Sequence, residues 1–328
     1  MPVNIEITLR EELLNRRQKL ESATVVFDER KALKSLLSEV DAALERMEAG
    51  TFGLCEVCHD PIEPERLIRD PLTQFCLDHL TLAQQRALEE DLMLASEIQR
   101  GLLPKNKLQI GEWEVSHFYE GAGPVSGDYC DLVETGDGSL YFVVGDVSGK
   151  GIAASMLMAH LHAMFRSLIS FGLPLNQIVE RASRVFCEST LPSHYATLVC
   201  GRAGLSGEVE LCNAGHLPSL VSCGGEITMV TASGLPLGMF HNEEFSTDKL
   251  SLSPGSTLLL YTDGLSEAQD GVGAEYGRER LARLVSESHA LPPEELIDTC
   301  LQDVAAFRSD AAKRDDLTIM AIRRVAGV

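Results

Sequence analysis

Positive charge is scarce in this chain. Its 28 Lys and Arg residues stand against 49 Asp and Glu, and the formal net charge is −21 over 328 residues. Contacts to nucleic-acid phosphates or to anionic lipids require clustered Lys and Arg. The composition therefore excludes electrostatic binding to nucleic acid or to a membrane surface.

Long hydrophobic runs are missing as well. No stretch of eighteen apolar residues occurs, and the N-terminus lacks a basic segment followed by an apolar one. The nine cysteines show no spacing typical of a disulfide framework, and most lie among apolar residues. We therefore expect a cytosolic (cytoplasmic) protein with reduced cysteines, made of one large domain and a small one.

Two helical patterns occupy the first fifty residues. Apolar residues recur at intervals of three and four over residues 5–20 and 29–48, which predicts one apolar face on each helix. The short segment Glu21–Asp28 between them favours an antiparallel helical hairpin, and Gly50 ends the second helix.

Two pairs of metal-ligand residues follow. Cys55 and Cys58 are separated by two residues, and so are Cys76 and His79. Such pairs suit the tetrahedral coordination of Zn²⁺, and a site filled by four protein ligands is structural. The alternative is two unrelated pairs of reduced cysteines with a chance His79.

This region resembles the DksA/TraR zinc-finger family over roughly residues 30–80. The resemblance rests on residues 41–47, 50–55, 61–62 and 65–67. His79 stands where members most often have a fourth cysteine. Members that act on RNA polymerase use a long coiled coil, whereas a 16-residue helix spans only about 24 Å. Polymerase regulation is therefore not implied.

A further helix is predicted over residues 81–101. Its apolar residues, Leu88, Leu92, Ala95, Ile98 and Leu102, are spaced by four, three, three and four. This stripe fits a coiled-coil seam in a homodimer. A single amphipathic helix packed on its own domain fits it equally well.

From Gly111 onward, strand-like runs alternate with helical ones. We expect strands at residues 113–119, 140–147, 196–202, 209–212, 257–262 and 317–322, and helices at 153–170, 175–189, 277–288 and 293–307. Consecutive short strands with two apolar faces favour antiparallel sheets with helices packed outside.

Four aspartates lie beside these strand-like runs. They are Asp128, Asp146, Asp263 and Asp315. If the fold gathers them, their like charges repel unless divalent cations lie between them. Asp146 precedes a flexible glycine-containing loop, whereas Asp137-Gly138 is interpreted as a plain hairpin turn. The set predicts a two-metal hydrolase.

Seven segments in order resemble the PP2C-like SpoIIE/RsbU family of metal-dependent protein phosphatases, over residues 88–325. They are residues 97–104, 125–131, 145–151, 213–216, 234–238, 261–264 and 315–318. The resemblance implies an α+β fold, a layered α/β-β/α sandwich of two antiparallel sheets flanked by helices. In this chain the helical hairpin and the small zinc finger precede it.

The resemblance also implies a bimetal centre. Its ligands would be the carboxylates of Asp128, Asp146, Asp263 and Asp315 and the carbonyl of Val147. Asp146 would bridge two Mn²⁺ or Mg²⁺ ions, and a water between the ions would attack the phosphorus. Asp316 is an alternative to Asp315, because both precede the same strand and only one should point inward.

Some positions depart from the family pattern. Ser126 replaces the usual first glycine before Asp128, and Ser148 and Lys150 stand where animal relatives have a histidine proposed as a general acid. The arginine that holds phosphate in those relatives has no evident counterpart. His216 is either a catalytic acid or, more commonly for such a residue, a hydrogen-bond partner of a loop.

Four parts are expected: a helical hairpin (1–50), a zinc finger (51–80), a linker helix (81–105) and a phosphatase domain (106–328). The activity implied is hydrolysis of phosphoserine or phosphothreonine, and the substrate implied is an anti-sigma-factor antagonist. We expect the zinc module to regulate the domain through the linker helix. The rivals are an RNA-polymerase-binding or scaffold regulator with a non-catalytic phosphatase fold, and a two-metal phosphohydrolase acting on a nucleotide or metabolite.

Overall fold

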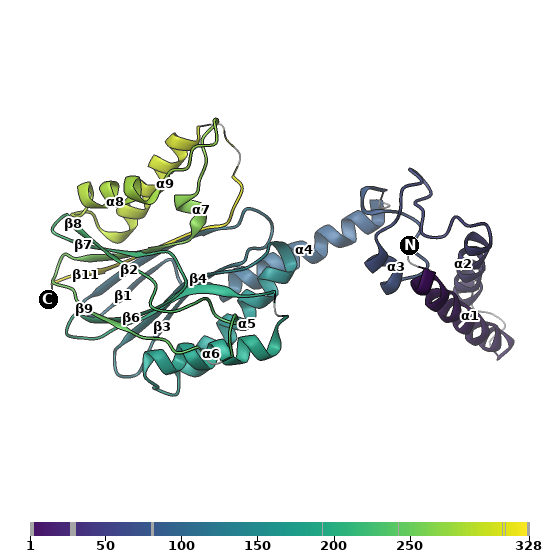
Figure 1. Ribbon diagram of the computed structural model, residues 1–328, viewed down its shortest axis with the longest axis horizontal. Helices are drawn as coiled ribbons and strands as arrows, with labels where there is room; N and C mark the ends of the chain where they lie inside the picture. The colour runs from purple at the N-terminus through teal and green to yellow at the C-terminus, as the bar shows by residue number, and fades with distance from the viewer. Residues whose placement is uncertain are drawn as a thin grey trace. The chain divides into compact units, whose positions relative to one another are not determined.

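A computed structural model describes residues 3–26, 31–79, 82–191, 193–241, 243–309, 311 and 313–326 (Figure 1). By the density of contacts, the chain divides into two compact units, residues 1–91 and residues 92–328. Each unit is described by itself below.

The N-terminal unit is built on a pair of helices, α1 (Val3–Val26) and α2 (Lys31–Glu48), followed by the short α3 (Pro64–Arg69) and a 3-10 turn (Leu77–His79). Leu13 of α1 and Val40 of α2 are buried in one cluster with Phe52 and Cys55. The expected hairpin is confirmed. However, α1 continues through Glu21–Val26, because that segment contains no Gly or Pro to end the helix. Residues 27–30, part of the expected connection and second helix, lie outside the described residues.

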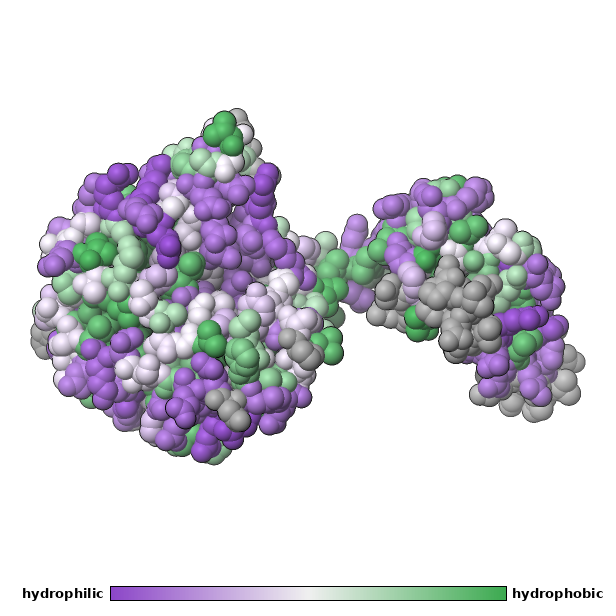
Figure 2. Space-filling model, in the orientation of Figure 1, coloured by the Kyte–Doolittle hydropathy of each residue, from purple (hydrophilic) through white to green (hydrophobic). Residues whose placement is uncertain are grey.

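The helix α4 (Leu82–Leu102) confirms the pattern read over residues 81–101, of which residue 81 lies outside the described residues. The boundary between the two units falls inside this helix, between Asp91 and Leu92. Leu88 and Ile98 of the apolar stripe are exposed, and Figure 2 shows hydrophobic residues at the surface along α4.

The second unit contains two antiparallel sheets among the described residues. One has the strand order β1-β2-β11-β10-β7-β8, with β1 (Lys107–Ile110), β2 (Trp113–Glu120), β7 (Ser219–Cys223), β8 (Glu226–Val230), β10 (Thr257–Tyr261) and β11 (Leu317–Arg324). The other has the order β3-β4-β5-β6-β9, with β3 (Asp128–Glu134), β4 (Leu140–Val147), β5 (Ala196–Ala203), β6 (Glu208–Ala214) and β9 (Asp248–Ser251).

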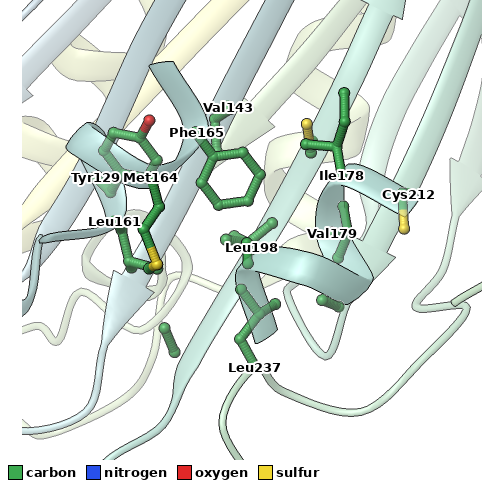
Figure 3. Packing of buried hydrophobic residues seen from close by; sticks show 14 of the residues in the cluster. Tyr129, Val143, Leu161, Met164, Phe165, Ile178, Val179, Leu198, Cys212 and Leu237 are labelled. Atoms are coloured by element: carbon green, nitrogen blue, oxygen red, sulfur yellow. The ribbon is translucent and has the colours of Figure 1, made fainter. Parts of the chain in front are cut away.

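Helices cover the outer faces of both sheets, as the apolar pattern predicts (Figure 1). Trp113, Phe142 and Leu258 belong to the cluster between the sheets. Outside the second sheet, α5 (Gly151–Ile169) and α6 (Leu175–Ser189) close a cluster around Phe165, shown in Figure 3. Outside the first, α8 (Arg278–Glu287) and α9 (Pro293–Arg308) close another. The layered α/β-β/α sandwich is confirmed.

Among the described helices, α5 alone has the length and apolar composition of a membrane span, with a mean hydropathy of 1.3 over its best window. Its buried side chains, Met158, Leu161 and Phe165 among them, pack against the second sheet and α6. That packing is typical of a helix with one face against a sheet.

Candidate metal centre

Two of the four aspartates face each other across a strand pair. Asp128 begins β3, Asp146 lies one residue before the end of β4, and the antiparallel register pairs them directly. A Cβ atom at Gly127 would lie 3.0 Å from the Val147 carbonyl oxygen and 3.2 Å from Oδ1 of Asp146. The carbonyl and the carboxylate therefore both approach Gly127, and they can do so because glycine has no side chain.

The other two aspartates come from the first sheet. Asp263 opens the short helix α7 (Asp263–Ser266) two residues after the end of β10, and Asp315 lies two residues before β11. Gly264 permits this approach, because a side chain there would overlap the carbonyl oxygen of Asp316. The neighbouring strands β10 and β11 thus carry both aspartates to the same end of the sheet.

Two threonines orient Asp128. Thr262 and Thr318 donate hydroxyl hydrogen bonds of 2.9 and 2.5 Å to Oδ2 of Asp128, whose side chain is 1% exposed. Oδ1 is buried without a hydrogen-bond partner among the described residues. One oxygen is held by the protein, and the other is available for a cation.

The electrostatics of the cluster are those of repelling carboxylates. Burial, followed by the negative charge of Asp146, raises the pKa of Asp128 well above its usual range. Burial, followed by the charges of Asp263, Asp315 and Asp316, raises the pKa of Asp146 to about 7. Burial and Asp315 also raise the pKa of Asp263. When all of these carboxylates are ionised, added positive charge is needed to offset their mutual repulsion.

Asp315 and Asp316 have different surroundings. Oδ1 and Oδ2 of Asp316 accept hydrogen bonds from the backbone N–H groups of Ala122 (2.7 Å) and Gly127 (2.9 Å). Asp315 pairs with the Lys150 ammonium group at 2.9 Å. Asp316 therefore fixes the loop before β3. Among the described residues, Oδ1 of Asp315 accepts only from the adjacent Asp316 N–H (3.1 Å), and the partner of its Oδ2 is an exposed side chain that another cation can replace.

His216 holds the turn that carries Asp263. Its ring lies 3.1 Å through Nε2 from the Tyr261 carbonyl oxygen and 2.9 Å through Nδ1 from the Thr197 hydroxyl. Because a carbonyl only accepts, Nε2 carries the proton and Nδ1 accepts. Burial lowers the pKa of His216 to about 4 against the opposing effect of the Tyr261 bond. Of its two predicted roles, the structure shows the hydrogen bond to a loop.

Gln99 of α4 contacts the loop before β3, a role that the sequence analysis does not predict. Its amide donates to the Ser126 carbonyl (2.7 Å) and accepts from the Ser126 N–H (3.0 Å). Ser126 Oγ in turn accepts from the Asp128 N–H at 3.1 Å. The only signal in the sequence was that Gln99 lies in a family-like segment.

The residues present fit two hard divalent cations. Asp128, Asp146 and Val147 supply oxygen atoms from one strand pair, and Asp263 and Asp315 supply carboxylates from the other sheet. Mn²⁺ and Mg²⁺ prefer such all-oxygen donor sets. The unpartnered Oδ1 of Asp128 is the observation that favours a cation most directly.

The cysteine pairs meet in the N-terminal unit. The ligand atoms of Cys55, Cys58, Cys76 and His79 all lie within 4.8 Å of one another. The Cys58 and Cys76 sulfurs are 3.7 Å apart, close to the roughly 3.8 Å edge of a tetrahedron with Zn–S bonds of about 2.3 Å. The four residues fit one zinc ion.

Two family models match this chain. Residues 136–325 match the model of the stage II sporulation protein E (SpoIIE) family. Residues 50–78 match the prokaryotic dksA/traR C4-type zinc finger. The match ends one residue before His79, and the family is described by four cysteines, whereas the cluster here has three cysteines and His79.

Curated relatives share about a quarter of their residues with this chain. Phosphoserine phosphatase RsbU of Bacillus subtilis is 24% identical over 251 residues, covering 75% of this chain and 74% of that protein. Protein IcfG of Synechocystis is 26% identical over 71% of this chain and 41% of its own length. Phosphoserine phosphatase RsbP of B. subtilis is 26% identical over 55% and 46%. The chain thus spans less than half the length of the latter two.

Solved structures share the fold. The SiaA-PP2C domain of Pseudomonas aeruginosa superposes with a TM-score of 0.66 at 22% identity, covering 74% of this chain and 99% of that domain. The RsbU and RsbW domains of a Mycobacterium tuberculosis protein give 0.58 at 27% identity, over 68% of this chain and 63% of that one. These likenesses confirm the PP2C-like fold of the second unit.

Proposed function

This chain belongs to the SpoIIE family, and on that premise we propose that it is a metal-dependent protein phosphatase that hydrolyses phosphoserine or phosphothreonine. One observation carries the proposal: buried Asp128, half-buried Asp146 and half-buried Asp263 come from both sheets with raised pKa values, and Oδ1 of Asp128 has no partner among the described residues. The names of RsbU and RsbP, phosphoserine phosphatases, support the same reaction.

The ligand set we propose follows the geometry. Asp128 and the Val147 carbonyl would hold one Mn²⁺ or Mg²⁺ ion, Asp263 and Asp315 would hold a second, and Asp146 would be a ligand of both. Asp315 is preferred to Asp316 because backbone N–H groups of a distant loop hold both oxygens of Asp316, whereas Oδ2 of Asp315 is held by the exposed Lys150 side chain and Oδ1 by the adjacent Asp316 N–H. When bound, such ions supply Lewis-acid activation of a phosphoryl group and of water.

The protein's own residues position the ligands for that chemistry. Thr262 and Thr318 fix one oxygen of Asp128, so its other oxygen keeps one direction. His216 stays uncharged near neutral pH and adds no positive charge to the turn before Asp263. Lys150 balances part of the charge of Asp315 until a cation binds.

Phosphate release tests the reaction. Wild-type protein with Mn²⁺ should release phosphate from a phosphoserine protein or an aryl phosphate, and Asp146→Asn should lose the activity. Asp137→Asn is the matched control, because Asp137 lies in the β3–β4 hairpin turn and pairs with Arg202. An inactive wild type, or a fully active Asp146→Asn, would contradict the proposal and favour the scaffold alternative.

For the substrate, we propose a phosphorylated anti-sigma-factor antagonist or a similar cytoplasmic signalling protein. The family membership supports this choice, and the net charge of −21 argues against nucleic acid as a substrate. Turnover of phosphoserine peptides should therefore exceed turnover of nucleotides and small phosphate esters. The reverse preference would indicate a metabolite phosphohydrolase.

For the N-terminal unit, we propose that zinc stabilises the fold and that α4 transmits its state to the phosphatase. Exposed Leu88 and Ile98 on α4 suit pairing with a second copy, and Gln99 bonds to the backbone two residues before Asp128. Deleting residues 1–80 should change both the phosphatase rate and the oligomeric state measured by light scattering. If neither changes, the module does not regulate the enzyme.

A further inference from the structure

A pocket of about 380 Å³ opens beside the aspartate cluster. Its lining includes the acidic residues Asp146 and Asp263, the apolar residues Leu217 and Pro218, and the basic residue Arg278. Pockets of this size hold ligands larger than a single phosphate group. The pocket thus extends from the proposed metal ligands to an arginine.

Arg278 is the first residue of α8, directly after Gly277, whose φ of 83° turns the chain into the helix. Its side chain is exposed, and no described residue accepts a hydrogen bond or ion pair from it. Its neighbour Arg280, in contrast, forms a two-point ion pair with Asp303. Arg278 therefore has a guanidinium group that is available to a ligand.

We propose that Arg278 is a substrate-recognition residue that binds an anionic, two-oxygen group of the substrate. This inference rests on the proposed phosphatase function and deepens it. The group is either the phosphoryl group itself or a carboxylate beside the phosphorylated residue, since both match the planar guanidinium fork.

Charge supports this assignment. A protein of net charge −21 repels anionic substrates, and Glu267 adds a carboxylate to the same pocket. Arg278 supplies positive charge to this pocket, whose lining also includes the proposed metal ligands Asp146 and Asp263. Leu217 and Pro218 offer an apolar surface to the substrate residues between the two anchors.

The experiment compares Arg278→Ala and Arg278→Lys with Arg283→Ala. Arg283 is exposed on the same helix but lies outside the pocket lining, so its variant removes the same charge without the contact. Each protein, loaded with Mn²⁺, is assayed on an aryl phosphate and on two phosphoserine peptides, one with acidic and one with neutral flanking residues. Binding of phosphonate versions of the peptides, which cannot be hydrolysed, is measured by fluorescence anisotropy.

We expect Arg278→Ala to lower kcat/KM roughly 10- to 100-fold, the size expected for a charged hydrogen bond, with Arg278→Lys in between and Arg283→Ala unchanged. Losses on all three substrates identify the phosphoryl group, and a loss confined to the acidic peptide identifies a carboxylate. Equal activity and equal phosphonate affinity in Arg278→Ala and wild type would overturn the proposal. An equal effect of Arg283→Ala would overturn it too. Because phosphonate binding needs no turnover, it tests Arg278 even if the phosphatase proposal fails.

Discussion

Replacing Asp146 by Asn should stabilise the metal-free protein at alkaline pH while abolishing its metal response. Burial and the charges of Asp263, Asp315 and Asp316 raise the folded-state pKa of Asp146 to about 7, from its ordinary value of 3.8. Folding therefore favours the protonated acid. The stability linked to Asp146 is fully present below pH 3.8 and is lost as the pH rises through 7.

The magnitude follows from the difference between these two pKa values. About 3 pH units at 1.36 kcal/mol each give a cost of about 4 kcal/mol at most above pH 7. Because Asp146 titrates together with the other aspartates, part of this cost belongs to the cluster and not to Asp146 alone. A gain of about 2 kcal/mol in the free energy of unfolding of Asp146→Asn would therefore already support the inference. Near pH 4 the variant and the wild type should be equally stable.

Trp113 makes the measurement specific. It is the single tryptophan of the chain and is fully buried in the second unit, so urea unfolding followed by its fluorescence reports on the sandwich alone. Unfolding is measured at pH 4 to 8.5 with EDTA, then with Mn²⁺, which should stabilise the wild type but not the variant.

Asp137→Asn again serves as the control, because the pKa of Asp137 is shifted in the opposite direction to that of Asp146. The Thr135 hydroxyl and the Ser139 N–H lower the pKa of Asp137 to about 2, so removing its charge should bring no gain at alkaline pH. A wild type that is as stable as Asp146→Asn at pH 8.5 without metal would refute the inference that the carboxylates repel one another.

Three further outcomes are expected. His216→Ala leaves the Tyr261 carbonyl without its partner and should lower the free energy of unfolding, followed by tryptophan fluorescence, by about 2–3 kcal/mol; an unchanged value would mean that His216 does not hold the turn. Thr318→Val removes one of two hydrogen bonds to Asp128 and should weaken Mn²⁺ binding about tenfold in calorimetry, and equal affinity would refute its orienting role. Cys76→Ser, or a zinc chelator, should reduce the helical circular dichroism of the N-terminal unit and leave the tryptophan transition in place, whereas retained helicity would show that zinc is dispensable for that unit's fold.

The sequence predicted the sandwich where burial is strongest. The predicted bounds of β4 coincide with the observed strand, Leu140–Val147. Its first six residues form one unbroken buried run between flanking layers. β3 was missed, although it carries Asp128. Its two aspartates oppose strand propensity, and only the structure shows that Arg166 neutralises buried Asp131 with bonds of 2.6 and 2.7 Å.

The short strands β7, β8 and β9 were missed for a different reason. β8 and β9 lie at sheet edges and expose most of their residues, so neither alternation nor an apolar run marks them. β7 is buried but has only five residues, two of them serine. Tertiary pairing, which local sequence does not encode, determines all three.

The choice between Asp315 and Asp316 depends on contacts that are distant in sequence. The two carboxylates are adjacent and chemically identical, so composition and spacing treat them alike. What separates them is a loop almost two hundred residues earlier, whose N–H groups at Ala122 and Gly127 meet Asp316 and not Asp315. That same loop contains Ser126, whose backbone N–H and carbonyl both form hydrogen bonds with the Gln99 side chain. Asp316 and Gln99 therefore hold one loop from distant parts of the chain, and hydrogen bonds through Ser126 link Gln99 of α4 to the backbone of Asp128.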